Sequence, residues 1–235
     1  MGIDYTGLHA ILLSQKNLIN KNRMLTMGRQ HIHLDQNTFD SIVRNSEIDL
    51  SGSYSYNSEI MFRKLGFGEV DSLDYSDYEG ATFIHDMNKQ IKIKKTYDYI
   101  YDGGTIEHVF NTGQFLENVI DLLEVGGVFC SVTCNNNFSG HGFYQFSPEF
   151  FLSCFNKNYG MSLLSLYLAQ VDTEISSWLD VKTYGSDNTG RNITKFDSIN
   201  PVYIITVAKK ISCERESLIK IPPQQYSYNE IDWKR

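Results

Sequence analysis

The sequence has no long apolar run and few cysteines. No stretch approaches the roughly 18 apolar residues that a membrane-spanning helix needs, and no signal peptide is visible, so we expect a cytoplasmic protein. The cysteines form no CxxC pair. His31, His33 and Asp35 have a spacing that could ligate a metal, but no second cluster of ligand residues completes such a site, so we expect no metal. Buried, reduced thiols are predicted at Cys130, Cys134, Cys154 and Cys213.

An excess of basic residues is also absent. The 235 residues include 21 Lys and Arg against 28 Asp and Glu, which gives a formal net charge of −7. An acidic chain repels phosphate backbones, so we expect no nucleic acid partner, although a local basic groove would overrule this argument. No GxGxxG motif follows the first predicted strand, which disfavours a nicotinamide-dependent oxidoreductase.

What is present is the alternation of strands and helices that an α/β protein requires. The length and the 41% hydrophobic residues favour one domain over residues 1–235. We expect a Rossmann-like, seven-stranded, mostly parallel sheet flanked by helices, with one antiparallel strand near its edge. Predicted strands cover 23–28, 69–74, a segment ending near 86, 96–104, 128–134, 161–169 and 202–208, and predicted helices cover 6–20, 37–44, 57–66, 112–125 and 147–158.

Two segments stand apart from this alternation. Residues 31–56 follow the first strand without a clean period, and we expect them to form an insertion or a lid. Residues 211–235 are expected to be an extended or flexible C-terminal extension. Between these segments, Gly126 and Gly127 are predicted to end the helix that begins at residue 112.

Acidic residues recur where predicted strands end. Asp74, Asp86 and Asp102 close three strands, and the carboxyl ends of parallel strands form the edge at which such sheets bind ligands. A carboxylate at that edge can accept both hydroxyls of a ribose, which predicts a nucleoside-containing cofactor. The alternative is that each Asp only starts a loop or caps a helix.

Two histidines are candidates for proton transfer. His108 follows Glu107 near the start of the helix after the fourth strand, and His141 lies between Gly140 and Gly142 in a polar loop. Imidazole is the side chain best suited to removing a proton near neutral pH. The alternative, that each histidine is structural, stays open.

Three stretches carry a family resemblance. The segments YDYIYDGGTIEHV (97–109) and LLEVGGVFCSVTC (122–134) resemble motifs of the class I S-adenosylmethionine-dependent methyltransferases. The segment GHGFYQFSPEFF (140–151) resembles a subgroup of these enzymes that is found beside genes for surface polysaccharides such as capsule and lipopolysaccharide. The resemblance covers about residues 23–155.

The first loop departs from the family pattern. The family has an acidic residue and a GxGxG-like loop after its first strand, and the matching stretch here is LTMGRQHIH (25–33). Gly28 matches the first glycine, Thr26 replaces the acid, and Arg29 and Gln30 replace the remainder. This change leaves open a catalytically altered protein that only binds the cofactor or acts as a scaffold.

The resemblance implies S-adenosylmethionine as the cofactor and assigns positions to it. Asp74 matches the ribose-binding acid, and Asp86 with Met87 matches the adenine-binding position. The full set of implied cofactor-binding residues is Gly28, Gln30, Asp74, Asp86, Met87, Asp102 and Gly103.

The resemblance also implies methyl transfer, with a base when the acceptor is a hydroxyl. We expect His108 or His141 to be that base and Tyr144 to orient the acceptor. The expected acceptor is a hydroxyl or phosphate-linked group of a sugar or sugar nucleotide, and the nearest rival is a small-molecule N-methyltransferase. No membrane partner is expected, and a homo-oligomer remains open.

Overall fold

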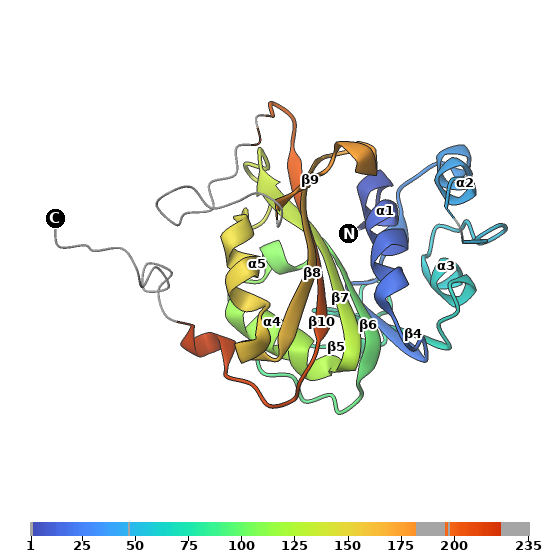
Figure 1. Cartoon of the computed structure of the whole chain (residues 1–235). Helices are drawn as coiled ribbons and strands as arrows, with labels where there is room; N and C mark the ends of the chain where they lie inside the picture. Colours follow the sequence, from blue (N-terminus) through green and yellow to red (C-terminus); the bar gives the residue numbers. More distant parts are fainter. Residues whose placement is uncertain (1, 47, 182–195, 197, 222–235) are drawn as a thin grey trace.

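An eight-stranded, mostly parallel sheet forms the middle layer of the computed structural model, which describes residues 2–46, 48–181, 196 and 198–221 (Figure 1). Its first five strands run parallel to one another, and their carboxyl ends lie at the same edge. In spatial order the strands are β5 (Phe83–Ile84), β4 (Glu69–Asp74), β2 (Arg23–Met27), β6 (Tyr97–Gly103), β7 (Leu123–Asn136), β10 (Val202–Lys210), β8 (Met161–Gln170) and β9 (Leu179–Asp180).

The expected antiparallel strand is β10. It pairs antiparallel with both β7 and β8, which confirms the prediction of a closing pair near the edge. The sheet has one strand more than predicted because the two-residue β9 adds to β8. The prediction of a Rossmann-like sheet flanked by helices is confirmed.

Helices cover both faces of this sheet (Figure 1). One layer holds α1 (Tyr5–Ser14), α2 (Gln36–Arg44) and α3 (Glu59–Lys64), and the other holds α4 (Thr112–Leu122) and α5 (Pro148–Cys154). Short 3-10 helices are η1 (Gln15–Asn17), η2 (Ile106–His108), η3 (Lys157–Tyr159), η4 (Ile175–Ser177) and η6 (Leu218–Lys220). Strand β6 joins the two layers, since Ile100 and Tyr101 are fully buried in hydrophobic clusters on opposite faces.

Polar side chains fix the starts of three helices. Asp4 accepts a hydrogen bond from Gly7 N in α1, Asp35 accepts one from Thr38 N in α2, and Asn111 accepts one from Gln114 N in α4. Each bond satisfies one of the amide groups that a first helical turn leaves unpaired. Asp4 and Asp35 therefore set where α1 and α2 begin.

The prediction that Gly126 and Gly127 end a helix is wrong. Helix α4 ends at Leu122, and β7 begins at once, so both glycines lie within the strand. The pairing of β7 with β6 shifts here, and Gly126 adopts a φ of +92°. The glycines therefore form an irregularity in the strand, where residues with a Cβ atom are disfavoured.

Residues 31–56 belong to the helical layer. They contain α2 and the short strand β3 (His31–Ile32), which pairs parallel with β1 (Gly2–Ile3). Phe39 and Leu50 of this segment are fully buried. The predicted insertion is thus packed into the core beside α1.

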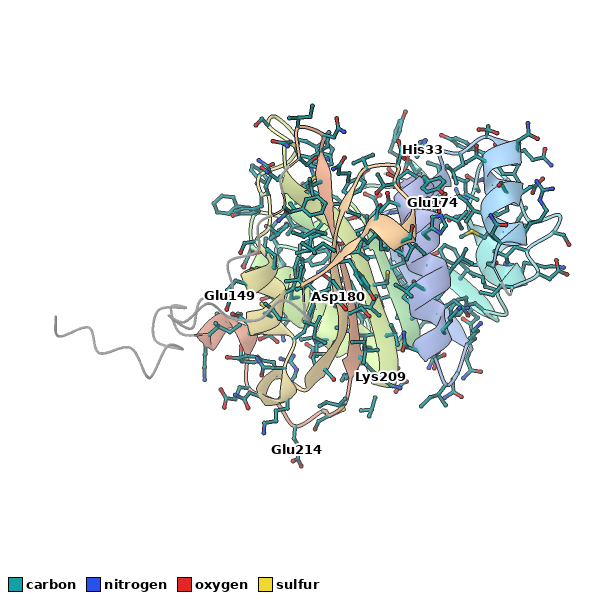
Figure 2. The ribbon with its side chains drawn as sticks, turned by 45° about the horizontal axis from the view of Figure 1, so that its top comes forward. His33, Glu149, Glu174, Asp180, Lys209 and Glu214 are labelled. Carbon is teal, nitrogen blue, oxygen red and sulfur yellow. The ribbon has the colours of Figure 1, made fainter. Side chains whose placement is uncertain are left out.

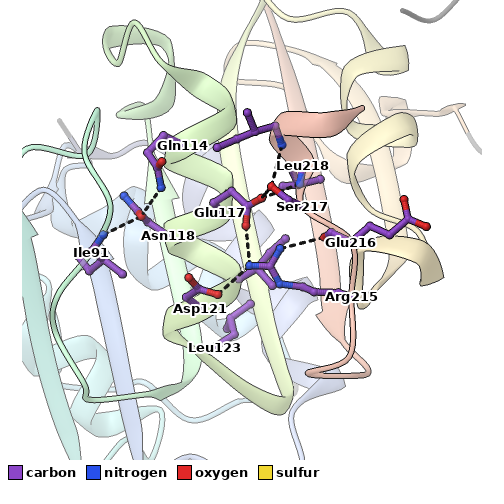
Figure 3. A network of polar contacts seen from close by, with 12 residues as sticks. Ile91, Gln114, Glu117, Asn118, Asp121, Leu123, Arg215, Glu216, Ser217 and Leu218 are labelled. Carbon is purple, nitrogen blue, oxygen red and sulfur yellow. Dashed lines mark hydrogen bonds and ion pairs between the residues drawn. The ribbon is translucent and has the colours of Figure 1, made fainter. Parts of the chain in front are cut away.

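The start of the C-terminal extension is docked on α4 (Figure 3). Arg215 lies 2.6 Å from Glu117 and 2.7 Å from Asp121, and Leu218 N donates to Glu117. The extended or flexible segment expected at 211–235 is therefore a packed one up to Ile221, while 222–235 lie outside the described residues.

Three of the four cysteines are buried, and Cys213 is exposed, so the prediction of a buried thiol is wrong at that position. In the described part of the chain, no helix combines the length and the apolar character that crossing a membrane requires.

Candidate active site

Two cavities adjoin at the carboxyl edge of the parallel strands. We call the first, of about 310 Å³, the apolar cavity; Met27, Leu73, Met87 and Val109 line it. We call the second, of about 280 Å³, the polar cavity; its walls include Asp4, His33, Glu107, His141 and Tyr203. His33 lies toward one end of the sheet, opposite Lys209 and Glu214 at the other (Figure 2).

One side chain lines both cavities. His108 contributes to the wall of the apolar cavity and to that of the polar cavity. It lies at the end of η2, and its ring centre is 4.8 Å from that of His141. The structure thus brings both predicted bases together at the junction of two spaces.

The apolar cavity contains four of the predicted cofactor residues. They are Gly28, Asp74, Asp86 and Met87. The Asp74 carboxylate accepts a hydrogen bond from Tyr75 N through one oxygen, Oδ1. Hydrogen bonds from the Asn88 side chain and backbone hold the pKa of Asp86 below its usual value. The other oxygen of Asp86, Oδ2, lies 3.2 Å from the Nζ of Lys89, so Asp74 is the more open acceptor of the two.

Gln30 is held against the end of β6. Its side chain is 1% exposed, and its Nε2 donates to Met27 O at 2.7 Å. Its Oε1 is buried and has no hydrogen-bond partner among the described residues. A buried carbonyl without a donor is rare and costly. Gln30 lines neither cavity, so its predicted contact with a cofactor stays a prediction.

Arg29 points into different contacts. Its Nε lies 2.7 Å from Glu59, and its Nη1 donates to Glu79 O. The chain then enters β3 instead of a helix, so the first loop lacks the helix N-terminus that commonly binds anions.

Asp102 lies beneath the site, not in it. It is fully buried, accepts hydrogen bonds from Thr105 N and Ser131 Oγ, and lines neither cavity. Burial, followed by the nearby charge of Glu107, raises the pKa of Asp102 to about 7. Its contacts make it a support for the turn at Gly103 and Gly104.

Glu107 is a polar-cavity residue that the sequence patterns did not single out. It is 1% exposed, and its Oε2 accepts a hydrogen bond from Thr133. Its Oε1 lies 3.7 Å from the Nε2 of His141 and 3.7 Å from the Sγ of Cys134. Successive residues of a 3-10 helix point in different directions, so Glu107 turns inward while His108 stays exposed.

The N-terminal segment supplies another unforeseen residue. Because β1 pairs with β3, Asp4 reaches the polar cavity from the other end of the chain. Burial raises the pKa of the Asp4 carboxyl. The pairing of two two-residue strands brings these segments together at the cavity, and no periodicity signals it.

Other predicted residues lie apart from the cavities. The Tyr144 hydroxyl donates to Phe110 O, and its ring packs beside Phe110 and Phe143. His31 stacks on Tyr56 and makes an edge-to-face contact with His33, with ring centres 6.5 Å apart, while Asp35 caps α2.

No protein-family model matches the chain, and no curated protein matches it in sequence. Among solved structures it is similar to TehB from Haemophilus influenzae, with 14% identity, a TM-score of 0.49 and coverage of 87% of this chain. This chain spans 63% of the length of that TehB chain.

It is also similar to a 1,6-didemethyltoxoflavin-N1-methyltransferase from Burkholderia thailandensis, with 12% identity over 87% of this chain and 77% of that chain and a TM-score of 0.47. For an rRNA methylase from Streptococcus thermophilus the identity is 10%, the coverage 88% and 97%, and the TM-score 0.41. These similarities concern the course of the chain alone.

Proposed function

We propose that this chain binds S-adenosylmethionine at the carboxyl edge of its sheet and transfers the methyl group to a hydroxyl of a small polar acceptor. The observation that carries the proposal is the position of His108 in the walls of both cavities. An apolar space for a nucleoside and a polar space for an acceptor then meet at a group able to accept a proton.

The apolar cavity suits an adenosine. Leu73, Met87 and Val109 offer apolar contacts for a flat base, and Asp74 at the end of β4 offers a carboxylate for the ribose hydroxyls. The resemblance in sequence assigns the same roles to Asp74 and Met87. A volume of about 310 Å³ lies within the usual range of small-molecule sites.

The first loop offers one fitting group for the amino-acid end of the cofactor. The unpartnered Oε1 of Gln30 is a suitable acceptor for an ammonium group. When bound, S-adenosylmethionine supplies the electrophilic methyl group, and the protein supplies alignment and proton removal. The departure from the family's glycine-rich loop, at Arg29 and Gln30, thus still provides a hydrogen-bond acceptor.

The polar cavity favours an uncharged acceptor. Its described lining residues include the carboxylates of Asp4 and Glu107 but no Lys or Arg. Such walls repel phosphate and can hydrogen-bond hydroxyls, so a plain hydroxyl fits better than a phosphate-linked group. In this proposal His108 takes the hydroxyl proton as the new bond to carbon forms.

A sugar is the acceptor that we propose. The exposed rings of Phe110 and Phe143 each lie two residues after a candidate base, His108 or His141. They present flat surfaces against which an apolar sugar face can pack. The pathway, modification of a surface polysaccharide, rests on the resemblance of residues 140–151 alone.

The carboxylates of the polar cavity also favour a second candidate, an amine acceptor. A cationic amine would be attracted by Asp4 and Glu107, and it would lose its own proton before methylation. The two candidates are distinguished by the atom that carries the labelled methyl group in the product, which is oxygen for a hydroxyl acceptor and nitrogen for an amine.

Two measurements test the proposal. Calorimetry with S-adenosylhomocysteine should show one site per chain, and its failure at millimolar ligand would contradict cofactor binding. Turnover of methyl-labelled S-adenosylmethionine is then followed by mass spectrometry with a panel of neutral sugars, sugar nucleotides and amines. His108→Gln should lower turnover by about 10²–10⁴-fold at nearly unchanged cofactor affinity. Binding without any turnover would leave a cofactor-binding or scaffold protein.

A further inference from the structure

Three different metal-ligating groups converge beside the polar cavity, which Glu107 and His141 line. The carboxylate of Glu107, the thiol of Cys134 and the imidazole of His141 place one donor atom each within 4.8 Å of the other two. They come from η2, from β7 and from the loop after β7. Two of the three residues, Glu107 and Cys134, are 1% exposed.

The thiol of Cys134 donates a hydrogen bond to Glu107, with 3.7 Å between Sγ and Oε1. The Oε1 of Glu107 is 3.7 Å from the Nε2 of His141, which is longer than a hydrogen bond. Ligand atoms that share a tetrahedral Zn²⁺ ion lie about 3.4–3.6 Å apart, given metal bonds of about 2.0–2.3 Å. The two distances of 3.7 Å from Glu107 Oε1, to His141 Nε2 and to Cys134 Sγ, are close to these values. The ligand atoms would have to move together only slightly to bind an ion.

The side chain of His141 can make that movement, while Gly142 and Phe143 hold the loop backbone against Glu107. Gly140 and Gly142 have φ values of +87° and +70°, and a Cβ atom at Gly140 would meet nothing within 4 Å. The His141 side chain is 53% exposed, so its ring is not held by packing on every side.

The charges also favour a cation. The carboxylate of Glu107 is buried, and its polar neighbours are the hydroxyl of Thr133, the thiol of Cys134 and the ring of His141. A second carboxyl, that of Asp102, is fully buried and interacts electrostatically with Glu107. A buried carboxylate is costly unless a positive charge compensates it.

A second observation points to a ligand in the same space. The hydroxyl of Tyr101, which lines the polar cavity, is fully buried and has no hydrogen-bond partner among the described residues. A ligand or a metal-bound water in the cavity would give this hydroxyl a partner.

We propose that Glu107, Cys134 and His141 bind one Zn²⁺ ion whose fourth position opens into the polar cavity. The donor set of carboxylate, thiolate and imidazole is one that zinc prefers, and three protein ligands with one open position are typical of reactive zinc sites. On binding, the thiol releases its proton to solvent, and two anionic ligands then balance the two charges of the ion.

The role of the ion rests on the proposed function. An acceptor hydroxyl in the fourth position loses its proton more readily, since a bound Zn²⁺ lowers the pKa of a coordinated oxygen. His108, which is not among the three ligands, stays free to receive that proton.

Metal binding can be measured on the full chain without any turnover. After chelator treatment, the protein is titrated with Zn²⁺, and with Co²⁺ as a spectroscopic substitute. We expect one ion per chain and, with Co²⁺, a thiolate charge-transfer absorption together with tetrahedral d–d bands. Cys134→Ser should abolish the charge-transfer absorption, while Cys213→Ser, which removes an exposed thiol elsewhere, should leave it unchanged.

An outer-shell variant sharpens the test. Thr133 donates to Glu107 at 2.7 Å, so Thr133→Val should weaken Zn²⁺ binding by about tenfold to a hundredfold while keeping the ligands. Glu107→Gln and His141→Gln should weaken it further.

Equal Zn²⁺ affinity in the parent protein and in Cys134→Ser, or a cobalt spectrum without a thiolate band, would overturn the proposal. Calorimetry with S-adenosylhomocysteine on the metal-free protein keeps the two proposals apart. Cofactor binding without metal binding would overturn only the zinc site.

Discussion

The side-chain oxygen of Gln30 lies over Gly103: a Cβ atom added at Gly103 would stand 2.6 Å from the Oε1 of Gln30. This close approach joins the loop after β2 to the loop after β6. It also shows that Gly103 is required by a neighbouring side chain, because there is no room for a methyl group between them.

Gly103→Ala should therefore displace Gln30 and weaken S-adenosylhomocysteine binding by about tenfold or more, since a charge-assisted hydrogen bond is at stake. Calorimetry measures this loss. Gly113→Ala is the matched control, because a Cβ atom there meets only Asn111 Oδ1 at 3.8 Å. Equal affinities of the two variants would contradict a role for Gln30.

Asp74→Asn should weaken the same ligand by about tenfold to a hundredfold, because the carboxylate is the proposed acceptor for the ribose hydroxyls. Asp77→Asn serves as the control, since Asp77 is exposed and lines neither cavity. Unchanged affinity in Asp74→Asn would place the nucleoside elsewhere.

Arg215→Ala should destabilise the fold by about 1–3 kcal/mol, because the Glu117 carboxylate would lose its cation while remaining largely buried. Burial alone would raise the pKa of Glu117, but hydrogen bonds from Arg215 and Ser217 outweigh it and lower that pKa. The stability from this pair is thus present above the usual carboxyl range and lost as the pH falls.

Urea denaturation measures this effect, with Lys220→Ala as a control that changes an exposed cation on the same extension. If the extension were dispensable for the fold, both variants would unfold at the same urea concentration as the parent protein.

The side chain of His9, in α1 on the face of the sheet opposite α4, should make the free energy of unfolding depend on pH. Burial lowers the pKa of His9, although Glu174 opposes the shift, and its buried Nε2 has no partner among the described residues. A lowered pKa means that the unfolded chain binds the proton more readily. Stability is therefore present above the ordinary value of 6.5 and lost as the pH falls below it.

His9→Phe keeps a ring beside Tyr5 and Trp178 but removes the titration. The free energy of unfolding should fall less steeply between pH 7.5 and 5.5 in this variant than in the parent protein, as measured by urea denaturation at a series of pH values. Parallel pH profiles would show that His9 is not responsible.

Much of the fold could be predicted because strands and helices alternate with clear periods. The strands near 161–169 and 202–208 were predictable from their apolar runs, and a short helix near 37–44 was expected although residues 31–56 show no clean period. The strand irregularity at Gly126 was not, since a helix stop and a bulge use the same residues.

The candidate site was predicted in part. Asp74 and Met87 could be placed because they follow parallel strands, whose carboxyl ends meet. Asp102 follows a strand too, yet its carboxylate turns back to Thr105 and Ser131. Position in the sheet fixes where a residue lies but not where its side chain points. Glu107 was missed because it lies in the short 3-10 helix η2, whose side-chain directions the sequence does not show.

The position of His108 in both walls couples the affinities of the two cavities. A side chain that forms part of two walls cannot move for one occupant without changing the space left for the other. If a bound nucleoside changes the affinity for the second ligand by some factor, the second ligand changes the affinity for the nucleoside by the same factor, because binding coupling is reciprocal. The affinity of each cavity for its ligand therefore depends on whether the other cavity is occupied.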